Sequence, residues 1–380
     1  MLTFFSVKNF RQFREELIFD FSKVRDYQFN TICVKNELVN KAIIYGKNAV
    51  GKTSLMEAMR DIYFTFTMRG RVLSNDPTYR NADSDENETI LFHYTFLLDD
   101  TIIDYKYEKT DFAHVVAEKL VFGNKIIFEY NRINNLYNFE NVDIIGAEQL
   151  QWDAFQNMNN NEDDVEIIDS LTALRFAYSN TAISQDTLLK KLVRFISGMR
   201  FSVGFSAINR NSHIRFLLNE LANSEEEKVK EFQDFLNEYG VQCKLIALQD
   251  ADGKKKLFFD HKMPLDFFDN MSSGTRLLTS FYLQFVKNDF PFSFVFIDEF
   301  DAYYHYELSE KIVMLLEKNF KCQVILTTHN TNLLSNSIMR PDCFLILHDG
   351  RITPICDATS RELRQGHNLE KLYMSGEFGD

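Results

Sequence analysis

A glycine-rich segment near the N-terminus has the residue types and the spacing of a phosphate-binding loop. The letters GKNAVGKT match the pattern G-x-x-x-x-G-K-[ST] through Gly46, Gly51, Lys52 and Thr53. An apolar run precedes the segment and a helical pattern follows it, so backbone N–H groups at a helix N-terminus would surround an anion. We expect Lys52 to reach the β- and γ-phosphates of a nucleotide, and the Thr53 hydroxyl to bind Mg²⁺. The nucleotide-binding residues expected here are Gly46, Lys47, Asn48, Ala49, Val50, Gly51, Lys52, Thr53 and Ser54.

Two later apolar runs end in residues that could act on a bound phosphate. FVFIDEFD ends in Asp298, which could hold Mg²⁺, and Glu299, which could polarise an attacking water as general base. VILTTHN carries His329 toward the same sheet edge, where it could sense or stabilise the transferred phosphate. Alone, these residues could be two solvated charges and a histidine without chemistry. With the phosphate-binding loop present, we expect Lys52, Glu299 and His329 to be catalytic, and Thr53 and Asp298 to hold the metal.

The stretch MSSGTRLL, residues 271–278, offers a second place for an anion. Ser272, Ser273 and Gly274 open a helical pattern, and a hydroxyl and a glycine at a helix start can bind phosphate. Alone, the stretch could equally be an ordinary serine-capped helix N-terminus. We count these three residues among the candidate nucleotide-binding residues because of their order relative to the other motifs.

The secondary-structure pattern indicates which elements would position these residues. Strands are expected at 2–7 and 16–21, and alternating apolar residues from about 89 to 131 predict an antiparallel meander. The pattern is helical from about 168 to 238, with Ser224 and Glu227 at capping-box spacing before one helix. Buried-strand patterns return later, joined by a helix, and predict a mostly parallel core sheet. Polar loops without chemistry are expected at 70–88 and 156–166.

These patterns predict an α/β protein with a mixed core sheet, an inserted antiparallel β meander and a helical lobe. We expect four parts. Residues 1–70 carry the phosphate-binding loop, 71–167 are an inserted β-rich region, 168–240 form the helical lobe, and 241–380 carry the remaining motifs. The abundant phenylalanine, 37 of 380 residues, is expected in the core.

Charge and composition restrict the partners. The net charge of −13 disfavours nucleic acid and anionic membrane unless a local basic face exists. Scattered cysteines, the lack of a signal-peptide layout and the lack of a long apolar stretch predict a cytoplasmic protein with free thiols and no membrane contact. The segment 189–215 contains six basic residues and no acidic one, and could bind DNA, a DNA-mimicking protein or an effector, or could instead neutralise acidic loops. The six are Lys190, Lys191, Arg194, Arg200, Arg210 and Arg215.

Four stretches, taken in their order along the chain, resemble the motifs of ABC-type P-loop ATPases, and within that class those of the SMC/RecF/OLD-like branch. The stretches are GKNAVGKT, MSSGTRLL, FVFIDEFD and LTTHN. FFSVKNFRQFREELIFDF is similar to that branch's first hairpin. MSSGTRLL corresponds to the signature motif LSGGQ, with Ser272 and Gly274 kept and Met271, Ser273 and Thr275 departing from it. The resemblance implies an ABC-type ATPase head that binds ATP and Mg²⁺. It also implies a homo-oligomer, because the signature motif closes over the ATP of a second subunit. The glutamine loop of the class cannot be assigned.

A narrower likeness lies in LTALRFAYSN, KKLVRFISGM and the tail RELRQGHNLEKLYMSGEFGD. These stretches are similar to ATPases of bacterial anti-phage systems, most of all the PARIS ATPase subunit AriA, then the AbiL and Septu ATPases. The likeness implies a sensor and scaffold for abortive infection, which holds a separate Toprim-type nuclease effector and releases it on sensing an acidic phage trigger protein. The chain ends soon after its last expected core strand, so the effector is expected to be a separate protein. The alternatives are a RecF-like repair ATPase that binds DNA directly and a structural ring that binds ATP but hardly hydrolyses it.

Overall fold

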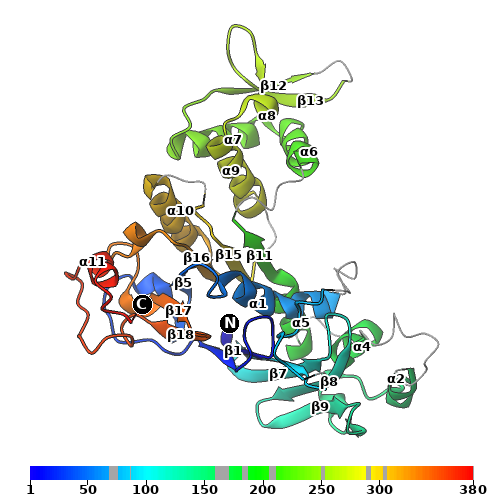
Figure 1. Cartoon of the computed structure of the whole chain (residues 1–380). Coiled ribbons are helices and arrows are strands. Elements are labelled where there is room, and N and C mark those ends of the chain that lie inside the picture. The colour runs from blue at the N-terminus through cyan, green and yellow to red at the C-terminus, as the bar shows by residue number, and fades with distance from the viewer. Residues whose placement is uncertain are drawn as a thin grey trace.

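The computed structural model describes most of the chain, and Figure 1 shows how its parts are arranged. The described residues are 1–67, 76–85, 87–158, 171–181, 187–204, 211–249, 253–287, 292–302 and 306–379. A core sheet lies in the middle of the molecule, with an antiparallel sheet toward one end and a helical lobe toward the other (Figure 1). The predicted fold class is therefore confirmed: this is an α/β protein with a mixed core sheet, an antiparallel β meander and a helical lobe.

The core sheet has six strands, and every neighbouring pair in it is parallel except the last, β17 and β18. In spatial order the strands are β11 (Met199–Val203), β15 (Phe294–Asp298), β16 (Gln323–Thr327), β5 (Lys41–Tyr45), β17 (Phe344–His348) and β18 (Arg351–Pro354). Every residue of β5, β15 and β16 is buried, which is why these runs are apolar rather than alternating. The order places β16 between the strand before the phosphate-binding loop and the strand that ends in Asp298.

The antiparallel sheet has seven strands in the order β10-β9-β8-β7-β6-β1-β2. Their bounds are β1 (Leu2–Lys8), β2 (Leu17–Asp20), β6 (Ile90–Leu98), β7 (Thr101–Lys109), β8 (Val115–Phe122), β9 (Lys125–Asn131) and β10 (Leu136–Asn138). The predicted meander is confirmed, and it continues the N-terminal hairpin because β1 pairs with β6. The buried Gln323 side chain joins the two sheets: its Oε1 accepts from Leu2 N at 2.7 Å and its Nε2 donates to Leu2 O at 2.9 Å. The four-part division of the chain stays a prediction.

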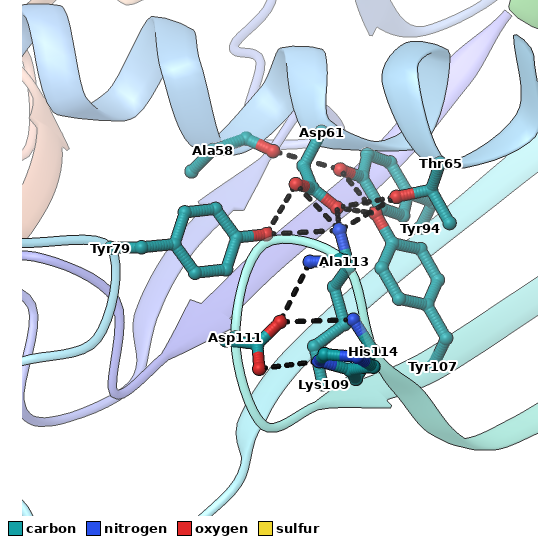
Figure 2. A network of polar contacts seen from close by, with 10 residues as sticks. All are labelled: Ala58, Asp61, Thr65, Tyr79, Tyr94, Tyr107, Lys109, Asp111, Ala113 and His114. Atoms are coloured by element: carbon teal, nitrogen blue, oxygen red, sulfur yellow. Dashed lines mark hydrogen bonds and ion pairs between the residues drawn. The ribbon is translucent and has the colours of Figure 1, made fainter. Parts of the chain in front are cut away.

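Helix α1 (Lys52–Thr67) packs between the two sheets. Its buried Asp61 forms an ion pair with Lys109 of β7, whose Nζ lies 3.0 Å from both carboxylate oxygens (Figure 2). Tyr107 donates to the same carboxylate at 2.8 Å, and Tyr94 of β6 donates to Ala58 O at 2.9 Å. The antiparallel sheet is thus fixed to the helix that begins at the phosphate-binding loop.

In the structure we use the name helical lobe for the described elements between residues 211 and 286, which pack through aromatic side chains. Its elements are α6 (Asn211–Ala222), α7 (Glu226–Glu238), β12 (Leu245–Gln249), β13 (Lys255–Phe259), β14 (Leu265–Asp266), α8 (Phe267–Asn270), α9 (Ser273–Phe281) and a π-helical turn, Tyr282–Val286. Phe232 of α7 packs against Phe267 and Tyr282, with ring centroids 5.7 and 4.9 Å apart. This contact joins α7 to α8 and to the π-helical turn that follows α9, on either side of residues 271–274.

One predicted cap is wrong. Ser224 does not cap α7, because its hydroxyl donates to Leu221 O at 2.6 Å and so closes the preceding helix instead. The residue at the N-cap of α7 is Glu225, which makes no side-chain capping bond. The chain reverses within a few residues here, so the serine serves the helix behind it rather than the one ahead.

The remaining helices cover the sheets. They are α2 (Trp152–Met158), α4 (Ala173–Asn180), α5 (Leu188–Gly198), α10 (Tyr306–Asn319) and α11 (Leu369–Met374), with short 3-10 turns at Thr31–Cys33, Val142–Ile145, Thr331–Leu333 and Pro341–Cys343. Two short strands, β3 (Val34–Lys35) and β4 (Leu38–Val39), form a separate ribbon. The loop predicted at 156–166 begins inside α2, and its remainder from 159 lies outside the described residues, as do 70–75 and 86 of the loop predicted at 70–88.

The phenylalanine-rich core that the composition predicts is confirmed. Many phenylalanines are buried in the core. All five cysteines are free thiols: Cys33, Cys243, Cys322, Cys343 and Cys356. Within the described part of the chain, no helix combines the length and the apolarity needed to cross a lipid bilayer.

Candidate functional site

The phosphate-binding loop runs from the end of β5 to the start of α1, and two of its positions leave no room for a side chain. A Cβ at Gly46 would lie 2.7 Å from Leu347 O of the neighbouring strand. Gly51 has a φ of +107°, and a Cβ there would overlap the Gln12 amide. The two glycines of the motif therefore allow the loop to turn tightly between two strands and the N-terminal hairpin.

Lys52 is buried at the start of α1, and its ammonium group lies inside the loop. Its Nζ donates to Gly46 O at 2.8 Å and to Lys47 O at 3.1 Å, and lies 2.9 Å from His329 Nε2. Burial lowers the pKa of Lys52, and the charges of Asp298 and Glu299 act in the opposite direction. Burial and then the charge of Lys52 lower the pKa of His329. A neutral imidazole can accept the hydrogen bond from the lysine, so the pair needs only one positive charge.

Thr53 and Asp298 meet although 245 positions separate them in the chain. Thr53 Oγ1 donates to Asp298 Oδ2 at 2.6 Å, and Thr327 Oγ1 donates to Asp298 Oδ1. Asp298 is fully buried and Thr53 is exposed. A hydroxyl and a carboxylate side by side are oxygen ligands of the kind Mg²⁺ prefers when phosphates and water complete its shell. The described residues contain no group of three or more His, Cys, Asp or Glu side chains that could hold a metal ion.

Glu299 follows Asp298 in an uncommon backbone conformation. Its φ is +46°, in the left-handed region, and its side chain is exposed. Its N–H donates to Thr327 Oγ1 at 2.8 Å. His329 is also exposed, two residues after the end of β16. The general-base candidate and the histidine candidate therefore leave the sheet at the same edge as the phosphate-binding loop.

The rest of the loop is open to solvent except at its ends. Lys47, Asn48 and Ala49 are exposed, and Val50 and Ser54 are half-buried. Ser54 Oγ donates to Gln12 Oε1 at 2.7 Å. Gln12 belongs to the turn between β1 and β2 and is a site residue that sequence reasoning missed. The letters NFRQF of that turn were the available signal, but nothing in their spacing indicates contact with residue 54.

Residues 272–274 lie on the helical lobe. Ser272 is the N-cap of α9: its Oγ accepts from Thr275 N at 3.1 Å and lies 2.8 Å from Thr275 Oγ1. Ser272 and Ser273 are exposed and Gly274 is half-buried. Among the described residues, no hydrogen bond joins 272–274 to the phosphate-binding loop of the same chain. The fold thus brings together Lys52, Thr53, Asp298, Glu299 and His329, but not the signature-like stretch.

The basic segment does not form one continuous free surface. Lys191 pairs with Asp99 and Arg215 pairs with Asp269, so two of its charges are neutralised within the chain. Arg200 donates to two backbone carbonyls, Ser197 O and Met199 O. Arg194 is exposed and Lys190 half-buried, whereas Arg210 lies outside the described residues. Ion pairs within the chain thus neutralise part of the positive charge of the segment.

Comparison with known families gives a match that covers most of the chain. A family model described as "AAA domain, putative AbiEii toxin, Type IV TA system" matches residues 41–335. The matched region contains every predicted site residue. Comparison with curated protein sequences gives no match.

Solved structures of SMC head domains are also similar. The crystal structure of the SmcHead bound to the C-winged helix domain of ScpA is 14% identical, with a TM-score of 0.47, and the match covers 93% of this chain and 96% of that chain. The SMC head domain from Thermotoga maritima is 13% identical, with a TM-score of 0.45 and coverage of 93% and 98%. The Smc head domain with an extended coiled coil bound to the C-terminal domain of ScpA, from Pyrococcus furiosus, is 14% identical, with a TM-score of 0.40 and coverage of 93% and 95%.

Proposed function

The chain belongs to the family of AAA domains described as putative AbiEii toxin of a type IV TA system, and from this premise we propose that it is a Mg²⁺-dependent ATPase whose site is completed by a second copy. One observation carries the proposal. Lys52 and Thr53 at the start of α1 contact His329 and Asp298, which come from two other strands of the core sheet. The N-terminus of α1 thus lies beside a lysine, a hydroxyl, a carboxylate and an imidazole. These are the groups that enzymes use to bind a nucleotide and transfer its phosphate.

Each residue has a role that follows from its position. The backbone N–H groups of 46–51 and the N-terminus of α1 would bind the phosphates, and the Lys52 ammonium would neutralise their charge. Thr53 and Asp298 would hold Mg²⁺, which supplies charge neutralisation for the phosphate oxygens. Exposed Glu299 would orient and deprotonate the attacking water, and the His329 imidazole would contact the transferred phosphate.

The signature-like stretch supports a site shared between two copies. Ser272, Ser273 and Gly274 present a hydroxyl-lined helix start on the lobe, and within one chain they do not bond to the loop. Two copies placed head to tail could bring this helix start onto the phosphates bound by the other copy. ATP would then join the copies, and hydrolysis would separate them.

Replacing Glu299 with Gln tests the proposal. The variant keeps the hydrogen-bonding shape but removes the base, so ATP should bind and remain unhydrolysed. We expect turnover to fall about 100-fold or more. We also expect the variant to elute as a dimer with ATP and Mg²⁺ and as a monomer without them, in size-exclusion chromatography with light scattering. Wild-type turnover in Glu299→Gln would contradict the assigned base, and an ATP-independent mass would contradict the shared site.

At the level of the cell, we propose a cytoplasmic sensor and scaffold of an anti-phage system of the abortive-infection type. The family description, which names a toxin–antitoxin system, supports this reading. In the finer form of the proposal the chain holds a separate Toprim-type nuclease and releases it on sensing an acidic phage protein, as the resemblance to the PARIS ATPase subunit AriA suggests. Co-purification with the product of the neighbouring gene, with and without ATP, tests this. A partner that binds equally well with Lys52→Ala would count against ATP control.

Direct DNA binding, as in a RecF-like repair ATPase, is the alternative. The internal ion pairs of Lys191 and Arg215 and the net charge of −13 weigh against it. DNA affinity that falls steeply with salt would support the alternative, because each phosphate contact releases counterions. In the sensor reading, Lys190→Glu with Arg194→Glu should abolish triggering and leave basal ATP turnover unchanged.

A further inference from the structure

Thr327 occupies the point where the motifs of the site meet. It is the last residue of β16, the strand between β5 and β15, and its side chain is fully buried. On one side lies the strand that leads into the phosphate-binding loop, and on the other the strand that ends in Asp298. A polar side chain buried at this place needs polar partners, and its partners are the two acidic positions of the site.

A single hydroxyl contacts both acidic positions. Thr327 Oγ1 donates its proton to Asp298 Oδ1 and accepts the N–H of Glu299 at 2.8 Å. The second oxygen of Asp298 accepts from Thr53 Oγ1 at 2.6 Å. The Asp298 carboxylate is thus held on one side by the residue that would share Mg²⁺ with it and on the other by Thr327. One hydroxyl therefore sets the orientation of the metal-binding carboxylate and the backbone of the base together.

Thr327 also holds the backbone turn that aims Glu299. The φ of +46° at Glu299 is unfavourable for a residue with a Cβ. Two bonds to Thr327 hold this turn: Glu299 N to Oγ1 at 2.8 Å and Phe300 N to Thr327 O at 3.1 Å. Without the hydroxyl, the turn loses the bond to the residue whose conformation is strained.

The neighbouring Thr328 makes the corresponding connection for the histidine. Its Oγ1 donates to Asp301 Oδ1 at 2.6 Å and accepts from Asn330 N at 2.8 Å. Its N–H donates to Ile44 O of β5 at 3.2 Å. His329 lies between Thr328 and Asn330, so its backbone is fixed to the turn that carries Glu299.

We propose that Thr327 is a positioning residue for ATP hydrolysis: its hydroxyl holds the Asp298 carboxylate and the Glu299 backbone in one arrangement, and Thr328 with Asp301 holds His329 in register with them. The inference rests on the proposed ATPase function. It assigns to the end of β16 a role beyond carrying the histidine, and it makes the geometry of the base depend on a fully buried residue.

The test compares Thr327→Val, which keeps the shape and removes the hydroxyl, with Thr327→Ser, which keeps the hydroxyl. We expect kcat of Thr327→Val to fall about 10- to 100-fold, since the base loses its alignment, while KM changes less than about threefold. Thr327→Ser should retain kcat within about threefold of wild type. Circular dichroism and melting temperature confirm folding, and Thr327→Ala replaces the valine variant if that fails to fold.

A second readout does not depend on turnover. Calorimetric titration with ATP in EDTA and in Mg²⁺ gives the gain in affinity due to the metal. Thr327→Val should lose part of that gain, because its Asp298 carboxylate is held from one side only, whereas its affinity in EDTA should equal that of wild type. A folded Thr327→Val with wild-type kcat and wild-type metal gain overturns the inference, and so does Thr327→Ser as impaired as the valine variant. No ATP turnover by wild type would instead overturn the proposed function itself.

Discussion

Helix α1 carries two polar clusters that differ in their exposure to solvent. At its N-terminal end, Lys52 and Thr53 meet Asp298 and His329, and Thr53 and His329 are exposed to solvent. Further along the helix, Asp61 meets Lys109 of the antiparallel sheet, with side chains only 1% and 2% exposed. We call the first the open cluster and the second the closed cluster.

The closed cluster satisfies its own charges. Lys109 Nζ lies 3.0 Å from both oxygens of Asp61, 2.9 Å from Thr65 Oγ1 and 3.1 Å from Tyr79 OH (Figure 2). Tyr79 and Tyr107 donate to the Asp61 carboxylate, and the pKa of both phenols is raised well above its ordinary value, in the first place by burial. Each charged group and hydroxyl group named here has a hydrogen-bond partner within the chain, as a buried ion pair requires.

The open cluster has the same kinds of groups, but Thr53 and His329 are exposed to solvent although Lys52 and Asp298 are buried. The Lys52 ammonium donates to loop carbonyls rather than to a carboxylate. The comparison teaches that one helix can be anchored at its middle by a satisfied network and remain free to bind a ligand at its start. Mutations in the closed cluster should therefore act on stability, and those in the open cluster on catalysis.

The largest expected effect is the loss of stability when the closed cluster is broken. Lys109→Ala leaves the Asp61 carboxylate buried without its counter-charge, which should lower the free energy of unfolding by about 3–5 kcal/mol. Urea denaturation measures this. The double variant Lys109→Met with Asp61→Leu removes both charges and should lose less than the single variant. If the double variant loses as much free energy of unfolding as the single variant, the charge pairing does not account for the stability that the network contributes.

Removing the lysine of the open cluster should leave the fold intact and abolish function. Lys52→Ala should lower kcat/KM for ATP by about 100- to 1,000-fold, because it removes the ammonium group that lies inside the loop, 2.8 Å from Gly46 O. The free energy of unfolding should change by less than about 1 kcal/mol. A coupled ATPase assay and denaturation measure the two effects, and Lys125→Ala, at an exposed turn of the antiparallel sheet, is the matched control. A large stability loss would contradict the division between the two clusters.

The smallest expected effect concerns Glu118, a buried acidic residue of the antiparallel sheet. Burial raises the pKa of Glu118 from 4.5 to about 7, although Ala173 N, Leu174 N and Tyr105 OH donate to its carboxylate. Because the folded protein binds this proton more tightly, the associated stability is full below about pH 4.5 and is lost as the pH rises through about 7.

Glu118→Gln should therefore reduce the fall in stability between about pH 4.5 and 7 by at least about 1 kcal/mol, measured by denaturation at several pH values. Burial also raises the pKa of Glu317 to about 7, so some fall should persist in the variant. An unchanged slope would mean that Glu118 is already ionised in the folded protein at low pH.

The parts of the fold and site that could be predicted follow from local spacing. The phosphate-binding loop, the strand ending in Asp298 and the strand leading to His329 are contiguous patterns, and parallel strands bring their carboxyl ends to one edge. The sequence could therefore predict that these motifs meet at one sheet edge, and in the structure Thr53 contacts Asp298 and Lys52 contacts His329.

What could not be predicted depends on pairing between distant segments. Asp61 looks like one more polar residue on an amphipathic helix until β7 places Lys109 against it. Gln12 reaches the phosphate-binding loop only because the turn between β1 and β2 folds over it. Ser224 has the spacing of a capping box, but the backbone direction at that turn gives its hydroxyl to the preceding helix. No local pattern contains these outcomes.

The central claim is that each ATP is hydrolysed between two copies, with the loop from one and residues 272–274 from the other. Mixing two inactive variants tests it directly. Lys52→Ala removes the loop lysine, and Gly274→Asp places a negative charge at the signature-like stretch, where a Cβ meets nothing closer than Ser272 Oγ at 4.0 Å, so the single chain should still fold. In a mixed pair, one of the two sites has both an intact loop and an intact signature-like stretch. Each variant alone should be inactive, and an equal mixture should recover about a quarter of wild-type ATP turnover, because half of the pairs are mixed and each has one intact site. A mixture as inactive as its components, or full activity of Gly274→Asp alone, would contradict the shared site.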